Sequence, residues 1–553
     1  MATINVNKEQ LFRLIGKKLK DEELEEKISM LGVGVDEIKG HEIVLDILPN
    51  RPDLLSVYGL ARLLSSSIGT NKENKEYFVN KSNYIINVDK ATNDWPYAVA
   101  AVVKDIRFDD DKIKEIIQLQ EKLCATFLRN RKKGGLGIYP LEKIKFPVKY
   151  TSDIPDKIKF IPLEYPYPIN GKEILDKHPT GREYKNIVQG WKKFPIFVDA
   201  NGAIMSMPPI INSNDLGKVT DETKNVFVEA TGTDFNTINT ALNILITSLA
   251  DMGGKIYSTK VVYKNKTHNL PNLKPSEIKV DVDYINNRLG LELKAINIKN
   301  LLLKMNYGPT KKDDVLLIPP YRADILHQID LVEDVAIAYG YNNLKEEIPN
   351  VATIAEENNF EIFKRKICNI LAGLGLLEVH TYNLTSKINQ SEKMNVDIKT
   401  VDLANALNKD YDVLRAWLIP TMLQILKENK HNEYPQNVFG CGNVFKHDSQ
   451  KDSCVAESVR LAVTLSHTNA NFTEIKQVFD SLVRALDLDY EIREVDHGSF
   501  IPGRVGRIKI KDIDVAYIGE IHPQVLENFE LEMPVSVLEL NLSDLFKIIK
   551  KEN

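Results

Sequence analysis

The sequence predicts a multidomain α+β protein, and three observations lead to this fold class. The chain has 553 residues, far more than one hydrophobic core usually supports, so we expect three or four domains. Hydrophobic residues make up 43% of the chain and charged residues 27%, an ordinary globular composition with apolar material for several cores. Stretches of helical periodicity also alternate with strand-like stretches along the whole chain.

The charge balance excludes one class of protein. The 72 basic and 77 acidic residues give a net charge of −5. A protein that grips nucleic acid over its whole surface needs clustered Lys and Arg, so we do not expect one. Short basic stretches occur at 17–20 and 129–133, and such stretches are more often solvated helix ends or loops.

The cysteines and the hydropathy pattern bear on the cellular environment. Four cysteines lie far apart without CxxC spacing, which suits a reducing compartment and gives no zinc or disulfide framework. No run of eighteen apolar residues occurs, and the N-terminus has no apolar signal region. We therefore expect a soluble, cytoplasmic protein with no membrane association.

Residues 1–90 form the first expected domain, an N-terminal α/β unit. Its predicted elements are helices at 8–15, 22–31 and 53–66 and a strand at 42–48. The stretch PNRPDLLS joins that strand to the last helix. Pro52 suits a helix start and Asp53 can cap the first turn, so we expect a rigid connection. The alternative is that Arg51, between two prolines, is displayed towards a partner.

Residues 91–268 form the second expected domain. Its predicted elements are strands at 95–106, 194–198 and 203–207 and a long helix at 112–131. The glycines of GGLG at 134–137 suggest a phosphate-binding loop, but no GxxxxGK[ST] pattern follows them. A plain turn is the favoured interpretation there.

Two hydroxyl-rich turns in the second domain are candidates for a binding site. They are SMPPIINS at 206–213 and TGTDF at 231–235, and each follows a predicted strand. They either line a pocket for a small polar ligand or are simply turn formers, and the sequence leaves both open. No Ser-His-Asp or Cys-His pattern is evident, so hydrolysis here would depend on a positioned water molecule.

Residues 269–347 form a small third domain of winged or helix-turn-helix-like character. Its predicted elements are strands at 279–282 and 315–318 and helices at 282–289 and 296–305. The stretch at 319–344 follows them, with a helix predicted from Asp324 to Gly340.

Four carboxylates crowd into eleven residues of this stretch: Asp324, Asp330, Glu333 and Asp334. On a helical wheel the last three lie opposite an apolar arc, which favours a solvated acidic face with Asp324 as N-cap. The alternative is a site for Mg²⁺ or Ca²⁺, which bind clustered oxygen ligands. A four-carboxylate site requires the chain to turn near Leu326, or a partner to complete the shell. Spacing alone favours the solvated face.

Residues 348–553 form the last expected domain. Helices are predicted at 363–374, 410–427 and 472–486, the second interrupted by Pro420, and strands at 378–384, 438–445, 459–466 and within 507–540. Mixed strands with helices on one side suggest an α+β domain around an antiparallel sheet. Arg415 and Glu378 are the obvious charges for an active site there, but an isolated pair of this kind is more often structural.

Several longer stretches occur in a fixed order along the chain. They are PNRPDLLS with YGLAR after it, SMPPIIN followed by TGTDF, PPYRADILHQIDLVEDVAIAYGYNN, DYDVLRAWLIPTMLQIL, NEYPQNVF and GEIHPQVL. In these stretches the chain resembles the beta subunits of phenylalanine–tRNA ligases, in their shorter archaeal and eukaryotic cytosolic form. The resemblance covers nearly all 553 residues.

This resemblance implies an (αβ)₂ heterotetramer that joins phenylalanine to tRNA(Phe) with ATP. The aminoacylation site then belongs to the alpha subunit, and this chain carries no catalytic residue for that reaction. The last domain has the class II synthetase fold but is catalytically silent and supports the subunit interface. The chain departs from the family pattern at Gly440, where a glutamate usually follows NVF.

The resemblance also implies two sites in this chain. The second domain resembles an editing domain that hydrolyses tyrosine mistakenly attached to the phenylalanine tRNA, because a pocket for phenylalanine cannot strongly reject a ligand that merely adds a hydroxyl. Its pocket residues would be Ser206, Asn212, Glu229 and Thr231, with Glu229 standing where a shorter acidic residue is expected. The third domain resembles a small domain that binds Mg²⁺, shared with the alpha subunit, through Asp324, Asp330, Glu333 and Asp334.

Within this resemblance the metal site becomes the favoured interpretation of the four carboxylates. Two alternatives to the leading functional hypothesis remain open. One is a stand-alone deacylase of mischarged tRNA, and the other is a pure scaffold subunit whose editing pocket has decayed.

Overall fold

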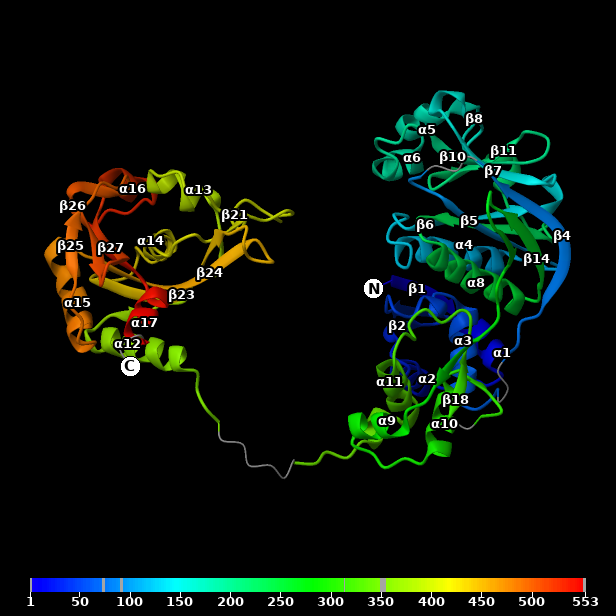
Figure 1. The fold of residues 1–553 in the computed structure, drawn as a ribbon, viewed down its shortest axis with the longest axis horizontal. Helices are drawn as coiled ribbons and strands as arrows, with labels where there is room; N and C mark the ends of the chain where they lie inside the picture. The colour runs from blue at the N-terminus through cyan, green and yellow to red at the C-terminus, as the bar shows by residue number, and fades with distance from the viewer. Residues whose placement is uncertain (1, 72–74, 90–92, 313, 349–354, 551–553) are drawn as a thin grey trace. The chain divides into compact units, whose positions relative to one another are not determined.

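The computed structural model describes residues 2–71, 75–89, 93–312, 314–348 and 355–550 (Figure 1). The chain forms two compact units, residues 1–348 and 349–553. Helices and strands alternate within both units, which confirms the predicted multidomain α+β class. Among the described residues no helix is both long and apolar enough to cross a membrane.

The first 70 residues form a three-stranded antiparallel sheet, in the order β1-β3-β2, with three helices. The elements are β1 (Ala2–Asn7), α1 (Lys8–Ile15), α2 (Asp21–Met30), β2 (Gly34–Lys39), β3 (Glu42–Ile47) and α3 (Val57–Ser67). Helix α3 begins later than predicted because Ser56, not Asp53, caps it: the Ser56 hydroxyl accepts the Gly59 N–H at 3.0 Å. The predicted cap at Asp53 is wrong, since that carboxylate pairs with Arg51.

A ten-stranded sheet dominates the middle of the first unit, in the order β12-β11-β10-β7-β4-β14-β5-β13-β6, with β15 paired to β14. Its strands are β4 (Val79–Val88), β5 (Tyr97–Lys104), β6 (Gly134–Pro140), β7 (Val148–Asp153), β10 (Phe194–Val198), β11 (Ile204–Met207), β12 (Ile211–Asn212), β13 (Val226–Gly232), β14 (Lys255–Val262) and β15 (Thr267–Leu270). Helices α4 (Asp110–Ala125) and α8 (Phe235–Asp251) lie side by side against it (Figure 1). The smaller elements are β8 (Lys159–Phe160), β9 (Ile169–Asn170), α5 (Gly171–Lys177), α6 (Pro179–Tyr184) and α7 (Asn214–Gly217).

The glycine-rich stretch GGLG is a buried strand, not the predicted turn. It opens β6, which pairs with β13 along its whole length. A side chain at Gly134 would lie 2.9 Å from the Thr231 carbonyl oxygen. The glycines therefore serve close strand and helix packing, and β6 can approach β13 only because they lack side chains.

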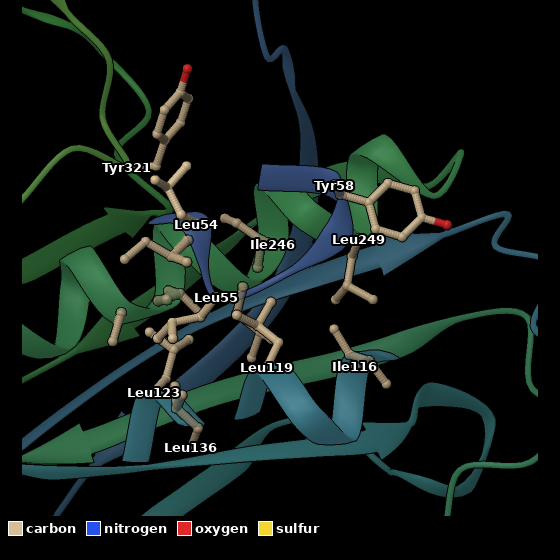
Figure 2. Packing of buried hydrophobic residues seen from close by; sticks show 14 of the residues in the cluster. Leu54, Leu55, Tyr58, Ile116, Leu119, Leu123, Leu136, Ile246, Leu249 and Tyr321 are labelled. Carbon is tan, nitrogen blue, oxygen red and sulfur yellow. The ribbon is translucent and has the colours of Figure 1, made fainter. Parts of the chain in front are cut away.

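One hydrophobic cluster joins the three blocks of the first unit. Figure 2 shows Leu54, Leu55 and Tyr58 from the N-terminal block gathered with side chains of α4 and α8. Those helical side chains are Ile116, Leu119, Leu123, Ile246 and Leu249. Residues of the third block, such as Tyr321, belong to the same cluster. The blocks thus share buried apolar surface, which stabilises them as one body.

The third block has a three-stranded sheet, β16-β18-β17, with three helices. Its elements are β16 (Ser276–Lys279), α9 (Val282–Leu289), α10 (Ala295–Lys304), β17 (Gly308–Pro309), β18 (Val315–Ile318) and α11 (Gln328–Tyr339). Helix α11 is capped by His327, so the predicted helix start and N-cap at Asp324 are wrong. The chain instead turns between Asp324 and Gln328, which is the condition that a four-carboxylate site requires.

The second unit is built on a seven-stranded sheet in the order β19-β23-β24-β28-β27-β26-β25, antiparallel except at β19. The strands are β19 (Leu377–Glu378), β23 (Gln436–His447), β24 (Val455–Ser466), β25 (Glu491–Glu494), β26 (Phe500–Ile510), β27 (Ile513–Ile521) and β28 (Val535–Asn541). The helices are α12 (Asn359–Gly373), α13 (Lys387–Gln390), α14 (Ile419–Glu428), α15 (Phe472–Ala485), α16 (Pro523–Asn528) and α17 (Leu542–Lys550). A small sheet, β20-β22-β21, comprises β20 (Leu384–Thr385), β21 (Val401–Asp402) and β22 (Val413–Leu414).

Two predictions for the second unit are wrong. The strand expected at 378–384 is limited to short bridges at its two ends. Of the helix expected at 410–427, only the part from Ile419 forms, with Pro420 in its first turn, where a missing N–H costs nothing. Before it, the Arg415 guanidinium donates to the carbonyls of Thr381 and Tyr382. These long-range bonds hold both stretches in irregular conformations.

Candidate functional site

The four residues predicted for the editing pocket lie in two pairs, at the two ends of the strand order of the ten-stranded sheet. Glu229 and Thr231 are two positions apart on β13, so their side chains point to the same face. They lie opposite Gly137 and Gly135 of β6. At the other end of the strand order, Ser206 of β11 pairs with Asn212 of β12.

The hydroxyl of Tyr139 connects these two pairs. It donates to Glu229 Oε1 at 3.0 Å and lies 3.1 Å from Asn212 Oδ1. Tyr139 was not among the predicted residues. The sequence feature that points to Tyr139 is an alternation along one face of β6, formed by Gly135, Gly137 and Tyr139. This alternation can be seen only once the stretch is recognised as a strand rather than a turn.

A cavity of about 420 Å³ opens beside these residues. Asn212, Glu229 and Thr231 line it, whereas Ser206 lies behind the lining and is 1% exposed. Apolar side chains complete the wall, including Ile113, Ile116 and Ile117 of α4 and Leu136 of β6. The wall also carries polar side chains, including Gln120, Glu121 and Lys218. A wall that combines apolar and polar groups suits a small amphipathic ligand, and the volume suits an aromatic side chain.

Two polar residues that line the cavity carry buried atoms that have no hydrogen-bond partner in the protein. Glu229 is 2% exposed and Thr231 fully buried, and Glu229 Oε2 and Thr231 Oγ1 are both unpaired. Burial raises the pKa of Glu229 to about 8, although the bond from Tyr139 acts in the opposite direction. Near pH 7 this carboxyl group is therefore mostly protonated, and it can both accept and donate a hydrogen bond.

Arg131 and His178 also line the cavity, and the side chains of both have hydrogen-bond partners in the protein. Arg131 Nη1 donates to the carbonyls of Pro209 at 3.1 Å and Ile210 at 2.8 Å. His178 Nδ1 accepts the Thr180 N–H at 3.2 Å, so the ring proton lies on Nε2, 3.1 Å from a carbonyl oxygen. Both histidine nitrogens are engaged, and neither is free to activate a nucleophile.

The predicted metal ligands are divided between two environments, the first of which is a buried ion cluster. Arg322 forms a bidentate pair with Asp324 at 2.8 and 2.7 Å and also donates to Asp334 Oδ2 at 2.9 Å. The Tyr307 hydroxyl donates to the same oxygen at 2.7 Å. Burial and then the charge of Asp334 raise the pKa of Tyr307. A cation that bound both aspartates would have to compete with Arg322.

Arg51 belongs to the same buried cluster. It pairs with Asp53 at 2.8 Å and lies 3.9 Å from Asp324 Oδ2. Arg51 is 8% exposed, so the hypothesis that it is displayed towards a partner is wrong. The PNRPDLLS stretch instead ties the N-terminal block to the third block through opposite charges.

The other two carboxylates lie nearer the surface. Asp330 Oδ2 accepts the N–H groups of Leu326 and His327, both at 2.7 Å, and so closes the turn before α11. Glu333, one turn further, is exposed. Among the described residues, no three His, Cys, Asp or Glu side chains come close enough together to form a metal-binding group.

The candidate charges of the second unit have structural partners. Arg415 is buried and donates to the carbonyl of Asn443 at 2.7 Å and to Thr381 Oγ1 at 2.5 Å. Glu378 lies 3.8 Å from His380 instead. At Gly440 an added Cβ would lie 3.0 Å from the Val379 carbonyl oxygen, so this sheet position has little room for a side chain.

Three family models match the chain. The model described as "Phe-tRNA synthetase beta subunit B1 domain" matches residues 1–68, "tRNA synthetase B5 domain" matches 278–341, and "Phenylalanyl tRNA synthetase beta chain CLM domain" matches 344–542.

Curated relatives match over the whole length. The phenylalanine–tRNA ligase beta subunit of Pyrococcus horikoshii is 40% identical over 99% of this chain and 100% of its own length. Those of Thermococcus sibiricus and Methanococcus aeolicus are each 39% identical, over 99% and 98% of this chain and 99% and 100% of their own. A solved N-terminal fragment of the Pyrococcus horikoshii subunit, also 39% identical, has a TM-score of 0.59 and covers 61% of this chain and 99% of its own.

Proposed function

Because the chain belongs to the family of phenylalanine–tRNA ligase beta subunits, we propose that it is the non-catalytic, editing-competent subunit of that ligase. In this proposal an alpha subunit carries the site that joins phenylalanine to tRNA(Phe) with ATP, and the two chains form an (αβ)₂ heterotetramer in the cytoplasm. The structural roles of Arg415 and Glu378 support a catalytically silent, class II-like second unit.

Activation of phenylalanine tests this division of labour. We expect the purified chain alone to form no phenylalanyl-adenylate, and co-expression with an alpha chain to restore it, as measured by phenylalanine-dependent pyrophosphate exchange. Activation by the single chain would overturn the assignment. Size-exclusion chromatography of native extract tests the stand-alone deacylase, which should elute without a second polypeptide.

The editing function rests on one observation: Glu229 and Thr231 line a cavity, and their buried Oε2 and Oγ1 atoms are unpaired in the protein. The hydroxyl of a tyrosyl group would satisfy such atoms. A phenylalanyl group would leave them buried without a partner, which costs about 1–3 kcal/mol for each group. With no activated nucleophile on the rim, hydrolysis would use a water molecule positioned at the ester bond.

Hydrolysis of tyrosyl-tRNA(Phe) by the assembled complex tests this function. We expect Ser206→Ala and Thr231→Ala to lower the rate at least about tenfold, since Thr231 carries a hydroxyl that lines the cavity and Ser206 carries one behind the lining. Thr233→Ala is the matched control, because Thr233 is exposed two residues further on. Equal rates in the wild type and all three variants would leave the scaffold hypothesis standing.

We extend the proposal to a Mg²⁺ ion held by Asp330 and Glu333 at the border with the alpha subunit. The ion would supply positive charge between acidic groups of the two chains. Asp324 and Asp334 would join it only by giving up Arg322. Electron paramagnetic resonance with Mn²⁺ as probe should show a bound ion in the complex that Asp330→Asn and Glu333→Gln remove. Exposed Glu347→Gln is the control, and unchanged binding in the first two variants would contradict the site.

A further inference from the structure

The hydroxyl of Tyr139 lies between two side-chain oxygens that come from different strands. Glu229 Oε1 of β13 is 3.0 Å away and Asn212 Oδ1 of β12 is 3.1 Å away. The hydroxyl donates to Glu229 Oε1, and this bond favours the charged carboxylate, whereas burial raises the pKa of Glu229 to about 8. Tyr139 is therefore in direct contact with Glu229, the buried carboxyl group of the pocket.

The strand opposite is built to leave room for this arrangement. Gly137 of β6 faces Glu229 of β13. A Cβ atom at Gly137 would overlap both Glu229 Oε1 and the Tyr139 hydroxyl. Tyr139 itself is fully buried, with its ring against Phe227. The ring is therefore held by packing, and its hydroxyl is a fixed point from which Glu229 is oriented.

We propose that Tyr139 is a positioning residue of the editing pocket, which anchors Glu229 Oε1 so that Oε2 is presented to the hydroxyl group of a tyrosyl ligand. This inference rests on the proposed editing function and deepens it. Glu229 lines the cavity, and its Oε2 atom is buried and has no partner in the protein. A tyrosyl hydroxyl donates to it, whereas a phenylalanyl ring cannot, and without the anchor the carboxyl group is free to rotate away.

The variant Tyr139→Phe tests the role, because it keeps the packed ring and removes only the hydroxyl. In the assembled complex we expect kcat/KM for tyrosyl-tRNA(Phe) hydrolysis to fall roughly tenfold to hundredfold. Hydrolysis of phenylalanyl-tRNA should change little, so discrimination between the two substrates should fall. Tyr150→Phe is the matched control: Tyr150 is equally buried in the same sheet, and its hydroxyl donates to the Trp95 carbonyl at 2.8 Å.

The pH profile separates positioning from a merely structural role. Ionised Glu229 accepts a stronger, charge-assisted bond, so kcat/KM of the wild type should rise with an inflection near pH 8. Because the bond from Tyr139 lowers the pKa of Glu229, Tyr139→Phe should move the inflection upward, and Glu229→Gln should abolish it. Gly137→Ala, which crowds the same contact, should reproduce the loss in discrimination.

The outcomes distinguish the two proposals. If the wild-type complex does not hydrolyse tyrosyl-tRNA(Phe), the proposed editing function itself is overturned. If the wild type hydrolyses it, and Tyr139→Phe matches the wild type in discrimination and in inflection, only the role of Tyr139 is overturned. A loss confined to Tyr139→Phe and Gly137→Ala, with Tyr150→Phe unchanged, supports the proposal.

Discussion

At Glu229, burial acts against the charged form of the carboxyl group. The pKa of this group is about 8 in the folded chain, against an ordinary value of 4.5. Between these two values the folded chain keeps a proton that the unfolded chain has released. The free energy of unfolding contributed by Glu229 is thus greatest below pH 4.5, falls as the pH rises to about 8, and is constant above that.

Glu229→Gln should remove this pH dependence, since the amide cannot ionise. We expect the variant to gain stability relative to wild type by about 1.4 kcal/mol for each pH unit between pH 5 and 8. Urea denaturation of both proteins at several pH values measures the difference. Exposed Glu222→Gln is the control. If the difference in unfolding free energy between the wild type and Glu229→Gln did not change with pH, the assigned protonation would be contradicted.

Arg322 is the only cation that contacts both Asp324 and Asp334 at hydrogen-bond distance among the described residues. Replacing it by methionine keeps the volume of the side chain but leaves two carboxylates in a buried site without their partner. We expect Arg322→Met to lower the free energy of unfolding by about 3–5 kcal/mol. Exposed Arg288→Met should change it by less than about 0.5 kcal/mol. Equal midpoints of the two variants in urea would show that the cluster contributes little.

At the scale of elements, helix α3 illustrates how a cap sets a boundary. Ser56 accepts the Gly59 N–H, and Glu115 of α4 accepts the Val57 N–H at 2.6 Å. Both bonds satisfy N–H groups that have no partner within the helix. The neighbouring domain therefore contributes directly to the start of this helix.

We expect Ser56→Ala to destabilise the chain by about 1 kcal/mol and Ser56→Gly by only a few tenths, because glycine tolerates the cap position. Thermal unfolding followed by circular dichroism would show the order. Asp53→Ala tests the predicted cap that the structure contradicts. This variant should leave the helix content unchanged, and any loss of stability should come from the lost ion pair with Arg51. If Ser56→Ala and Ser56→Gly were equally stable, side-chain capping would not be the cause.

Locally determined elements could be predicted from the sequence. The bounds at 8–15, 282–289, 194–198 and 315–318 agree with the structure. The two helices among them have strong apolar periodicity and a cap immediately before them, at Asn7 and Asp281. Local signals therefore suffice where no distant contact opposes them.

Elements held by distant contacts could not be predicted in this way. The stretch before α14 has helical periodicity, yet Arg415 bonds carbonyls more than 30 residues away and Trp417 Nε1 donates to the Gln390 carbonyl at 3.1 Å. The candidate site shows the same division. Glu229 and Thr231 were named from motif position, whereas Tyr139 and Gly137 emerge only from the pairing of β6 with β13.

At the scale of the whole molecule, the first unit unites blocks that the sequence separates at residues 90 and 268. One hydrophobic cluster runs through all three. Arg62 of α3 pairs with Asp251 of α8 at 2.6 Å, and Asn243 of α8 donates to the Pro320 carbonyl at 3.1 Å. Bonds of this kind couple the unfolding of each block to that of the others.

We expect residues 1–348, expressed alone, to fold and to unfold in one cooperative transition, because this unit contains its own core. A fragment of residues 1–268 should be less stable or insoluble, since it exposes the surface that the third block covers. Scanning calorimetry of the two fragments measures this. Two separate transitions within residues 1–348 would show that the blocks are energetically independent.

The buried cluster of Arg51, Asp53, Arg322, Asp324 and Asp334 has a consequence for behaviour on heating. The free-energy cost of removing charged groups from water falls as temperature rises, while the attraction between the groups persists. Hydrophobic stabilisation per unit area levels off over the same range. The share of the stability of the first unit that comes from these charges should thus be larger in hot solution than at room temperature.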